Sequence, residues 1–165
     1  MNTDNCKLMT LKSNIRQNRL VIKLACECLN SSGSGFANVN RNNDQGTFPH
    51  TYATARDTQT GIEYLIGITG RGERKADGDW DPEFNLVRTE ENRREARALA
   101  ARMKKKLAFV AIALRKADGA YAAYFGELDT IGFPRAIPML PFDRTRYRQL
   151  SGYPQDVRVK ELLAG

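Results

Sequence analysis

The chain has 165 residues, enough for one domain with a sizeable core, and its 41% hydrophobic and 27% charged residues are typical of soluble globular proteins. The sequence contains no run of 18 or more apolar residues, so no membrane-spanning helix is expected. A net charge of +7 and a sequence pI of about 9.5 favour an anionic partner, most commonly nucleic acid. We therefore expect a single domain over residues 1–165 that does not cross a membrane.

The N-terminal half is expected to form a helix, a loop and a β-hairpin. Apolar residues recur at helical spacing over residues 7–30, and the Asn-Ser-Ser-Gly run at the end of this segment stops a helix. Residues 34–49 are rich in Gly, Asn and Ser, which predicts a flexible loop, with a short edge strand over residues 36–39 as an alternative. Residues 51–56 alternate as a strand, and after a turn residues 62–69 return as its partner.

The C-terminal half is expected to begin with a long polar loop and a second helix. Thr89 can cap a helix over residues 90–106, whose first turn is acidic and whose last turn is rich in lysine, in accord with the helix dipole. Residues 107–115 are apolar on both faces, as in a central strand covered on both sides. A further strand is expected over residues 120–128, and repeated prolines predict a loop-rich extension over residues 134–165.

The order of these elements predicts the fold class. A helix, a hairpin, a second helix, a buried strand and a further strand indicate an α/β protein with a central mixed β-sheet flanked by helices. The connection from the strand at residues 62–69 to the strand at residues 107–115 is expected to be right-handed. A short terminal helix near residues 155–163 completes the prediction.

This order resembles the PD-(D/E)xK nuclease superfamily, which has the restriction-endonuclease-like fold. The segment TYATARDTQTGIEYLIGITGR, residues 51–71, looks like the hairpin that carries the motif of these enzymes, with Gly70 and Arg71 matching the residues after it. The resemblance implies an aspartate on the first strand and Glu-x-Lys on the second, which together hold a divalent metal beside the phosphate. In this chain those positions fall at Thr51 (or its neighbour His50), Gly67 and Thr69. The resemblance therefore implies a degenerate motif, with no catalytic residue and no bound metal.

Asp57 and Glu63 are the acidic residues of the hairpin. As displaced metal ligands they would hold Mg²⁺ in an active endonuclease, with Arg71 or Lys75 in place of the lysine. As structural residues, Asp57 would start the turn and Glu63 would face solvent. The structural interpretation is favoured.

Basic residues in three segments are candidates for phosphate contacts, because lysine and arginine gain binding energy by releasing counterions. They follow the second hairpin strand, lie on the second helix and lie near the C-terminus: Arg71, Arg74, Lys75, Arg93, Arg97, Arg102, Arg144 and Arg146. Tyr147, between two arginines, could stack on a base. A solvated basic helix face and a packed tyrosine are the alternative interpretation.

We interpret the chain as a nucleic-acid-binding protein, a non-catalytic subunit or accessory factor, with DNA favoured over RNA. An active Mg²⁺-dependent endonuclease and a protein-interaction module with incidental charge stay open as alternatives, as does a homodimer. The three cysteines, Cys6, Cys26 and Cys28, lack metal-ligand spacing, and the N-terminal segment lacks the apolar core of a secretory signal. These features predict a cytoplasmic protein without a resident cofactor.

Overall fold

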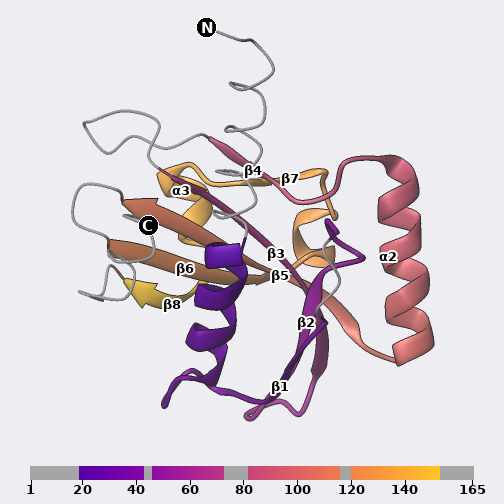
Figure 1. Ribbon diagram of the computed structural model, residues 1–165, viewed down its shortest axis with the longest axis horizontal. Helices are drawn as coiled ribbons and strands as arrows, with labels where there is room; N and C mark the ends of the chain where they lie inside the picture. The colour runs from indigo at the N-terminus through magenta and orange to yellow at the C-terminus, as the bar shows by residue number, and fades with distance from the viewer. Residues whose placement is uncertain (1–18, 43–45, 73–81, 116–119, 153–165) are drawn as a thin grey trace, which may run out of the picture.

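The structure is a computed structural model that describes residues 19–42, 46–72, 82–115 and 120–152 (Figure 1). Six strands form the large sheet, in the order β1-β2-β3-β5-β6-β8. Their bounds are Phe36–Arg41 for β1, Tyr52–Asp57 for β2, Glu63–Gly72 for β3, Lys106–Arg115 for β5, Ala120–Glu127 for β6 and Arg148–Gly152 for β8. Two short strands, β4 (Glu83–Asn85) and β7 (Ala136–Pro138), form a separate antiparallel pair.

The helical elements are few. Residues 19–30 are helical, α2 spans Glu90–Met103, a 3-10 turn spans Asp129–Ile131, and the short α3 spans Pro141–Arg144. Thr89 caps α2 as predicted, since its hydroxyl accepts a hydrogen bond from the backbone N–H of Asn92.

The large sheet is mixed, which confirms the predicted class. β2 pairs antiparallel with both β1 and β3, and β3 pairs with β5 in parallel after the chain has passed through α2. The hairpin of β2 and β3 was predicted correctly, and its register pairs Tyr52 with Gly67. Beyond β5 the sheet continues antiparallel through β6 and β8.

Each face of the sheet carries its own core. Ile66, Val110 and Ile112 pack under the helical residues 19–30, while Leu65 and Phe109 pack against α2 and the β4–β7 pair. In Figure 1 the N-terminal helix and α2 accordingly lie on either side of β3 and β5. Residues 107–114 are all buried, so the prediction of a central strand covered on both sides is confirmed.

The sheet is strongly curled. The ring of Phe36 on β1 lies 4.8 Å from that of Phe125 on β6, although three strands separate β1 from β6 in the sheet. The curl wraps the sheet around the core on the side of residues 19–30.

The loop predicted over residues 34–49 is wrong in two places. Residues 36–41 form the edge strand β1, longer than the alternative strand considered, and Phe48 is buried in the core. Polar residues are compatible with this edge strand because one side of it faces solvent. Asn38, which has a positive φ, lies within the register shift between Ala37 and Asn40.

The loop-rich extension predicted from residue 134 contains three elements, and β8 is the sixth strand of the large sheet. The prolines are compatible with these elements because Pro138 ends β7 and Pro141 begins α3, where no amide hydrogen bond is lost. The second helix ends at Met103 and not at residue 106, because Lys104 is left-handed. Residues 7–18 of the first predicted helix and the terminal helix near 155–163 lie outside the described residues.

Candidate functional site

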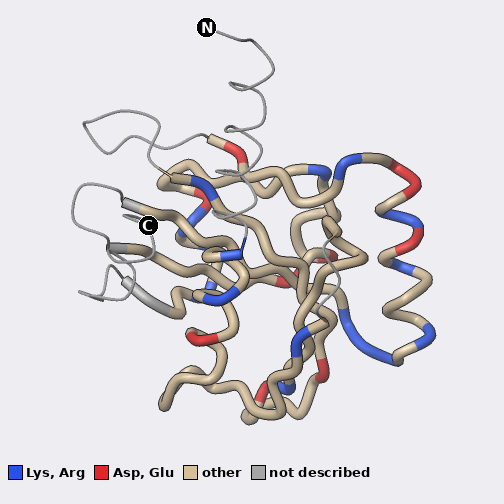
Figure 2. The backbone as a smooth tube through the Cα atoms, in the orientation of Figure 1, with Lys and Arg blue, Asp and Glu red and all other residues tan. Residues whose placement is uncertain are grey.

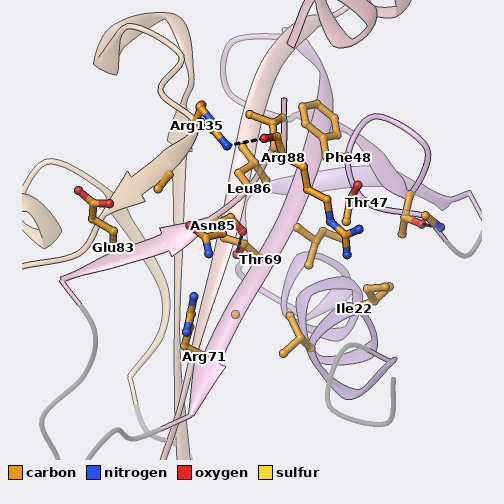
Figure 3. Close-up of a pocket in the computed structure, with 17 residues that line it drawn as sticks. Ile22, Thr47, Phe48, Thr69, Arg71, Glu83, Asn85, Leu86, Arg88 and Arg135 are labelled. Carbon is orange, nitrogen blue, oxygen red and sulfur yellow. Dashed lines mark hydrogen bonds between the residues drawn. The ribbon is translucent and has the colours of Figure 1, made fainter. Parts of the chain in front are cut away.

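A pocket of about 820 Å³ lies at the C-terminal end of β3 (Figure 3). Its walls come from the first turn of the described helix at residues 19–30, the loop at residues 46–51, the end of β3, and the chain around β4 and β7. Ligands of α/β sheets commonly bind beyond the carboxyl ends of the strands, and pockets of this size accept small molecules. This pocket is therefore the strongest candidate site among the described residues.

Three arginines from separate segments line the pocket: Arg71 at the end of β3, Arg88 before α2, and Arg135 before β7. A guanidinium N–H of Arg135 donates to the backbone oxygen of Arg88, which fixes the two segments together. In Figure 3 the side chain of Arg88 reaches toward Thr47, whereas Arg71 lies on the other side of Thr69. Among the described residues, no carboxylate forms an ion pair with Arg88 or Arg135.

The floor of the pocket carries neutral hydroxyl groups. Thr69 is buried and its hydroxyl donates to the backbone oxygen of Asn85 over 2.6 Å. Thr51 is also buried, and its hydroxyl accepts a hydrogen bond of 2.9 Å from the amide of Gly46. Glu83 is the one acidic residue among the described lining residues, and Figure 3 shows it at the edge, directed away from Thr69. The pocket is thus cationic at its rim and neutral at its floor.

The three positions of the degenerate motif come together only in part. Thr51 and Thr69 line the same pocket, but Gly67 is absent from its described wall. A Cβ atom at Gly67 would lie 2.8 Å from Cδ1 of Leu86 and 2.9 Å from Cγ of Phe48, so these side chains cover the position. A glutamate at this position would have to displace the side chains of both Leu86 and Phe48. A glycine inside a strand often marks the close approach of another group, and here that group is these two core side chains.

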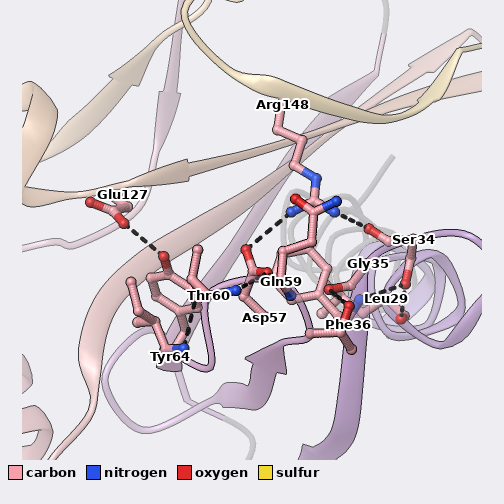
Figure 4. A network of polar contacts seen from close by, with 12 residues as sticks. Leu29, Ser34, Gly35, Phe36, Asp57, Gln59, Thr60, Tyr64, Glu127 and Arg148 are labelled. Carbon is pink, nitrogen blue, oxygen red and sulfur yellow. Dashed lines mark hydrogen bonds and ion pairs between the residues drawn. The ribbon is translucent and has the colours of Figure 1, made fainter.

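Asp57 and Glu63 lie near the turn between β2 and β3, at the other end of the hairpin from the pocket. The carboxylate of Asp57 accepts hydrogen bonds from the amides of Gln59 (2.8 Å) and Thr60 (3.3 Å) and pairs with Arg148 at 3.3 Å (Figure 4). Glu63 is exposed and pairs with Lys105 at 3.5 Å. These contacts give both acids structural roles, and no group of three or more potential metal ligands occurs within the described ranges.

The arginines of α2 divide into packed and exposed side chains. Arg93 and Arg97 lie over the ring of Phe133, at 5.9 Å and 5.3 Å from its centroid, and Arg93 also pairs with Glu90 at 3.4 Å. Figure 2 shows basic residues continuing along α2 and into the turn after it, and Arg102, in the last turn of the helix, is exposed. The predicted phosphate-binding face is therefore partly a packing surface. Arg74 and Lys75 lie outside the described residues.

The C-terminal candidates have structural partners. Arg144 donates to the backbone oxygen of Met139 over 2.8 Å, and Arg146 lies 4.9 Å from the ring centroid of Phe142. Tyr147 is buried, its hydroxyl donates to the oxygen of Pro138 over 2.6 Å, and its ring packs edge-on against Phe109. Burial raises the pKa of Tyr147 to about 12. Of the two interpretations that the sequence left open for Tyr147, the packed tyrosine is confirmed, because the ring is part of the core.

The sequence analysis named Arg71 as a candidate for phosphate contacts. It did not identify the other polar residues of the pocket, Arg88, Arg135 and Asn85. Arg88 directly precedes the helix cap, and Arg135 lies among prolines, so neither belongs to a recognisable motif. They meet because β4 and β7 pair with each other, aligning Asn85 with Ala136. Only this long-range pairing brings the three side chains to the end of β3.

No family model matches this chain, and comparisons with curated proteins and with solved structures also gave no match. Within the described residues, no helix has both the length and the apolar character needed to cross a membrane.

Proposed function

We propose that this protein binds nucleic acid through the arginine-lined pocket at the end of β3, without cleaving it. The observation that carries the proposal is the convergence of Arg71, Arg88 and Arg135, from three distant segments, on one pocket. Guanidinium groups bind phosphate oxygens through forked hydrogen bonds, and their charge displaces counterions. The net charge of +7 adds a long-range attraction for the same ligand.

The element order supports a more specific proposal for the fold. A helix, the antiparallel hairpin of β2 and β3, the crossover helix α2 and the parallel strand β5 follow in the order that the nuclease superfamily resemblance implies. On this basis we assign a restriction-endonuclease-like core in which the site where relatives would cut has become a binding site. DNA remains the favoured ligand.

The chemistry of the floor supports binding without cleavage. Metal-dependent hydrolysis of a phosphodiester requires carboxylates that hold the metal and help to generate hydroxide. The aspartate position of the motif holds Thr51, whose hydroxyl is neutral and already hydrogen-bonded, and the glutamate position is the covered Gly67. The lysine position holds Thr69, whose neutral hydroxyl donates to the backbone oxygen of Asn85. Among the described lining residues Glu83 is the one carboxylate, and it lies at the edge of the pocket, so no pair of carboxylates is placed there to hold a metal beside a phosphate.

The proposal is tested by titrating labelled DNA and RNA oligonucleotides of one sequence and following fluorescence anisotropy at several salt concentrations. Binding should weaken steeply with salt, and Arg88→Ala should lower the log–log salt slope by about one. Arg56→Ala is the matched control, because it removes one exposed positive charge from the hairpin away from the pocket and should leave the slope nearly unchanged. Equal effects of the two variants would show that charge alone, and not the pocket, binds the ligand.

The same oligonucleotides, incubated with Mg²⁺ or Mn²⁺, test for cleavage. We expect intact strands on a denaturing gel. Cleavage by the unmodified protein that disappears in Asp57→Asn would instead support the endonuclease alternative and place its metal near the hairpin turn.

A further inference from the structure

We infer that the pocket holds a single unpaired nucleotide, with its base inside and its phosphates at the arginine rim, so that the protein selects single strands over duplexes. This inference rests on the proposed function and names the form of nucleic acid that the same site recognises.

The size of the pocket is the first argument. A protein that only follows a duplex backbone needs surface arginines, because phosphates are reached from outside. Here the arginines surround a hollow of about 820 Å³, within the range of pockets that enclose a small ligand. A phosphate alone would leave most of that volume unused.

The apolar part of the walls is the second argument. Ile22, on the helix at residues 19–30, and Ile68, on β3, are half-buried residues that line the pocket, and the buried Leu86 and Val87 also line it. Figure 3 shows Ile22 on the helix that borders the hollow. A charged phosphate gains nothing from such surfaces, whereas the face of a base is apolar and is stabilised when water is removed from it.

The third argument is a polar side chain of the pocket wall, that of Asn85. Asn85 is exposed, lines the pocket, and its amide has no side-chain hydrogen bond among the described residues. Its backbone oxygen is fixed by Thr69, so the residue is held in place while the amide stays available. A side-chain amide offers one donor group and one acceptor, the pair that reads the edge of a base.

The two rim arginines complete the fit. Arg71 and Arg88 lie on different sides of Thr69 in Figure 3, so a nucleotide between them would present one phosphate to each. In a duplex the base is stacked and its pairing edge is occupied, and extruding it has an energetic cost. Single strands should therefore bind more tightly than duplexes of the same sequence.

The test compares three 12-nucleotide DNA probes at about 50 mM salt: a single strand, its duplex, and a single strand with abasic sites throughout. We expect the single strand to bind about tenfold or more tighter than both others. The abasic strand keeps the phosphates and removes the bases, so it separates base insertion from charge.

Two uncharged substitutions place the effect in the pocket. Asn85→Ala removes the amide, and Ile22→Trp fills the hollow. Each should lower the affinity for the ordinary single strand toward that for the abasic strand, and so reduce the ratio of the two affinities. Ile62→Trp, at a half-buried position outside the pocket, is the control, and circular dichroism checks that each variant is folded.

The outcomes separate this inference from the proposed function. Equal binding of the abasic and the ordinary single strand, lowered by Arg88→Ala, would overturn base insertion and retain the proposed function. Absence of binding by any probe at this salt concentration would overturn both.

Discussion

At the scale of single residues, Gly67 shows how the protein uses a position that resembles a catalytic one. Phe48 and Leu86 lie against its Cα hydrogens, and both belong to the core on the α2 side of the sheet. The glycine is therefore required by packing. Two residues further on, Thr69 reaches the pocket, where its hydroxyl anchors Asn85.

We predict that Gly67→Ala lowers the free energy of unfolding by about 1–3 kcal/mol, because the added methyl group overpacks a core with no room for it. Chemical denaturation measures the change. Leu86→Ala removes one of the two blocking side chains, so the double variant should be less destabilised than the sum of the single variants. Strict additivity would contradict this explanation.

Glu127 is a second residue whose environment has a measurable consequence. It accepts a hydrogen bond of 2.6 Å from the hydroxyl of Tyr64 (Figure 4) and pairs with Lys106 at 3.0 Å. The hydrogen bond from Tyr64 is the main cause that lowers the pKa of Glu127 below its ordinary value of about 4.5, and Lys106 contributes further. The carboxylate is thus favoured in the folded state.

Because the pKa of Glu127 is lower in the folded state than in the unfolded state, its carboxylate stabilises the fold at any pH above the unfolded-state pKa. This stabilisation is lost as the pH falls through the folded-state pKa. We predict that Glu127→Gln and Tyr64→Phe each reduce stability at neutral pH by about 1–2 kcal/mol and flatten the loss of stability below about pH 4.5. Thermal unfolding at a series of pH values measures both effects. Tyr124→Phe removes a hydroxyl with no hydrogen-bond partner among the described residues and should follow the unmodified protein.

At the scale of elements, α2 is the crossover that makes β3 and β5 parallel. Thr89 starts it with a side-chain cap, and the acidic Glu90 and Glu91 lie in its first turn, where the helix dipole favours negative charge. It ends at Met103 and is followed by the cap residue Lys104, whose φ of 56° lies in the left-handed region that favours glycine. The reversal lets Lys106 begin β5 only three residues after the helix ends.

We predict that Lys104→Gly raises the free energy of unfolding by up to about 1 kcal/mol, because a glycine adopts this conformation without strain. Lys104→Ala is the control, since it removes the same charge and keeps a Cβ atom. Denaturant titrations should rank the glycine variant above the unmodified protein and the alanine variant at or below it. The reverse order would show that the lysine side chain itself stabilises the turn.

At the scale of the whole molecule, Arg148 stabilises the curl of the sheet through contacts between its two edges. This residue lies on β8, one edge of the sheet, yet it pairs with Asp57 at 3.3 Å, donates to the backbone oxygen of Ser34, and covers the ring of Phe36 at 4.6 Å. Its partners belong to or adjoin β1 and β2 at the other edge (Figure 4). The charge pattern of the sequence gives no sign that this arginine differs from its neighbours.

We predict that Arg148→Ala destabilises the protein by about 1–3 kcal/mol, because it leaves the mostly buried carboxylate of Asp57 without its cation. Arg148→Lys should restore only part of the lost stability, since an ammonium group cannot pair with Asp57 and at the same time lie flat on the ring of Phe36. Arg146→Ala is the nearby control. Its side chain lies over the exposed Phe142, so this substitution should change the free energy of unfolding by less than about 0.5 kcal/mol. Similar losses for Arg146→Ala and Arg148→Ala would contradict the role of Arg148.

The sequence by itself determined the elements whose signals are local. The hairpin, the cap at Thr89 and the buried strand after α2 follow from alternation, capping chemistry and continuous apolar character, which act over neighbouring residues. The tertiary structure alone decided that β1 and β8 join the sheet, that Gly67 is covered, and that Arg88 and Arg135 meet Arg71. These features depend on pairings between segments far apart in the chain, as between β4 and β7, and such pairings leave no periodic trace in either segment.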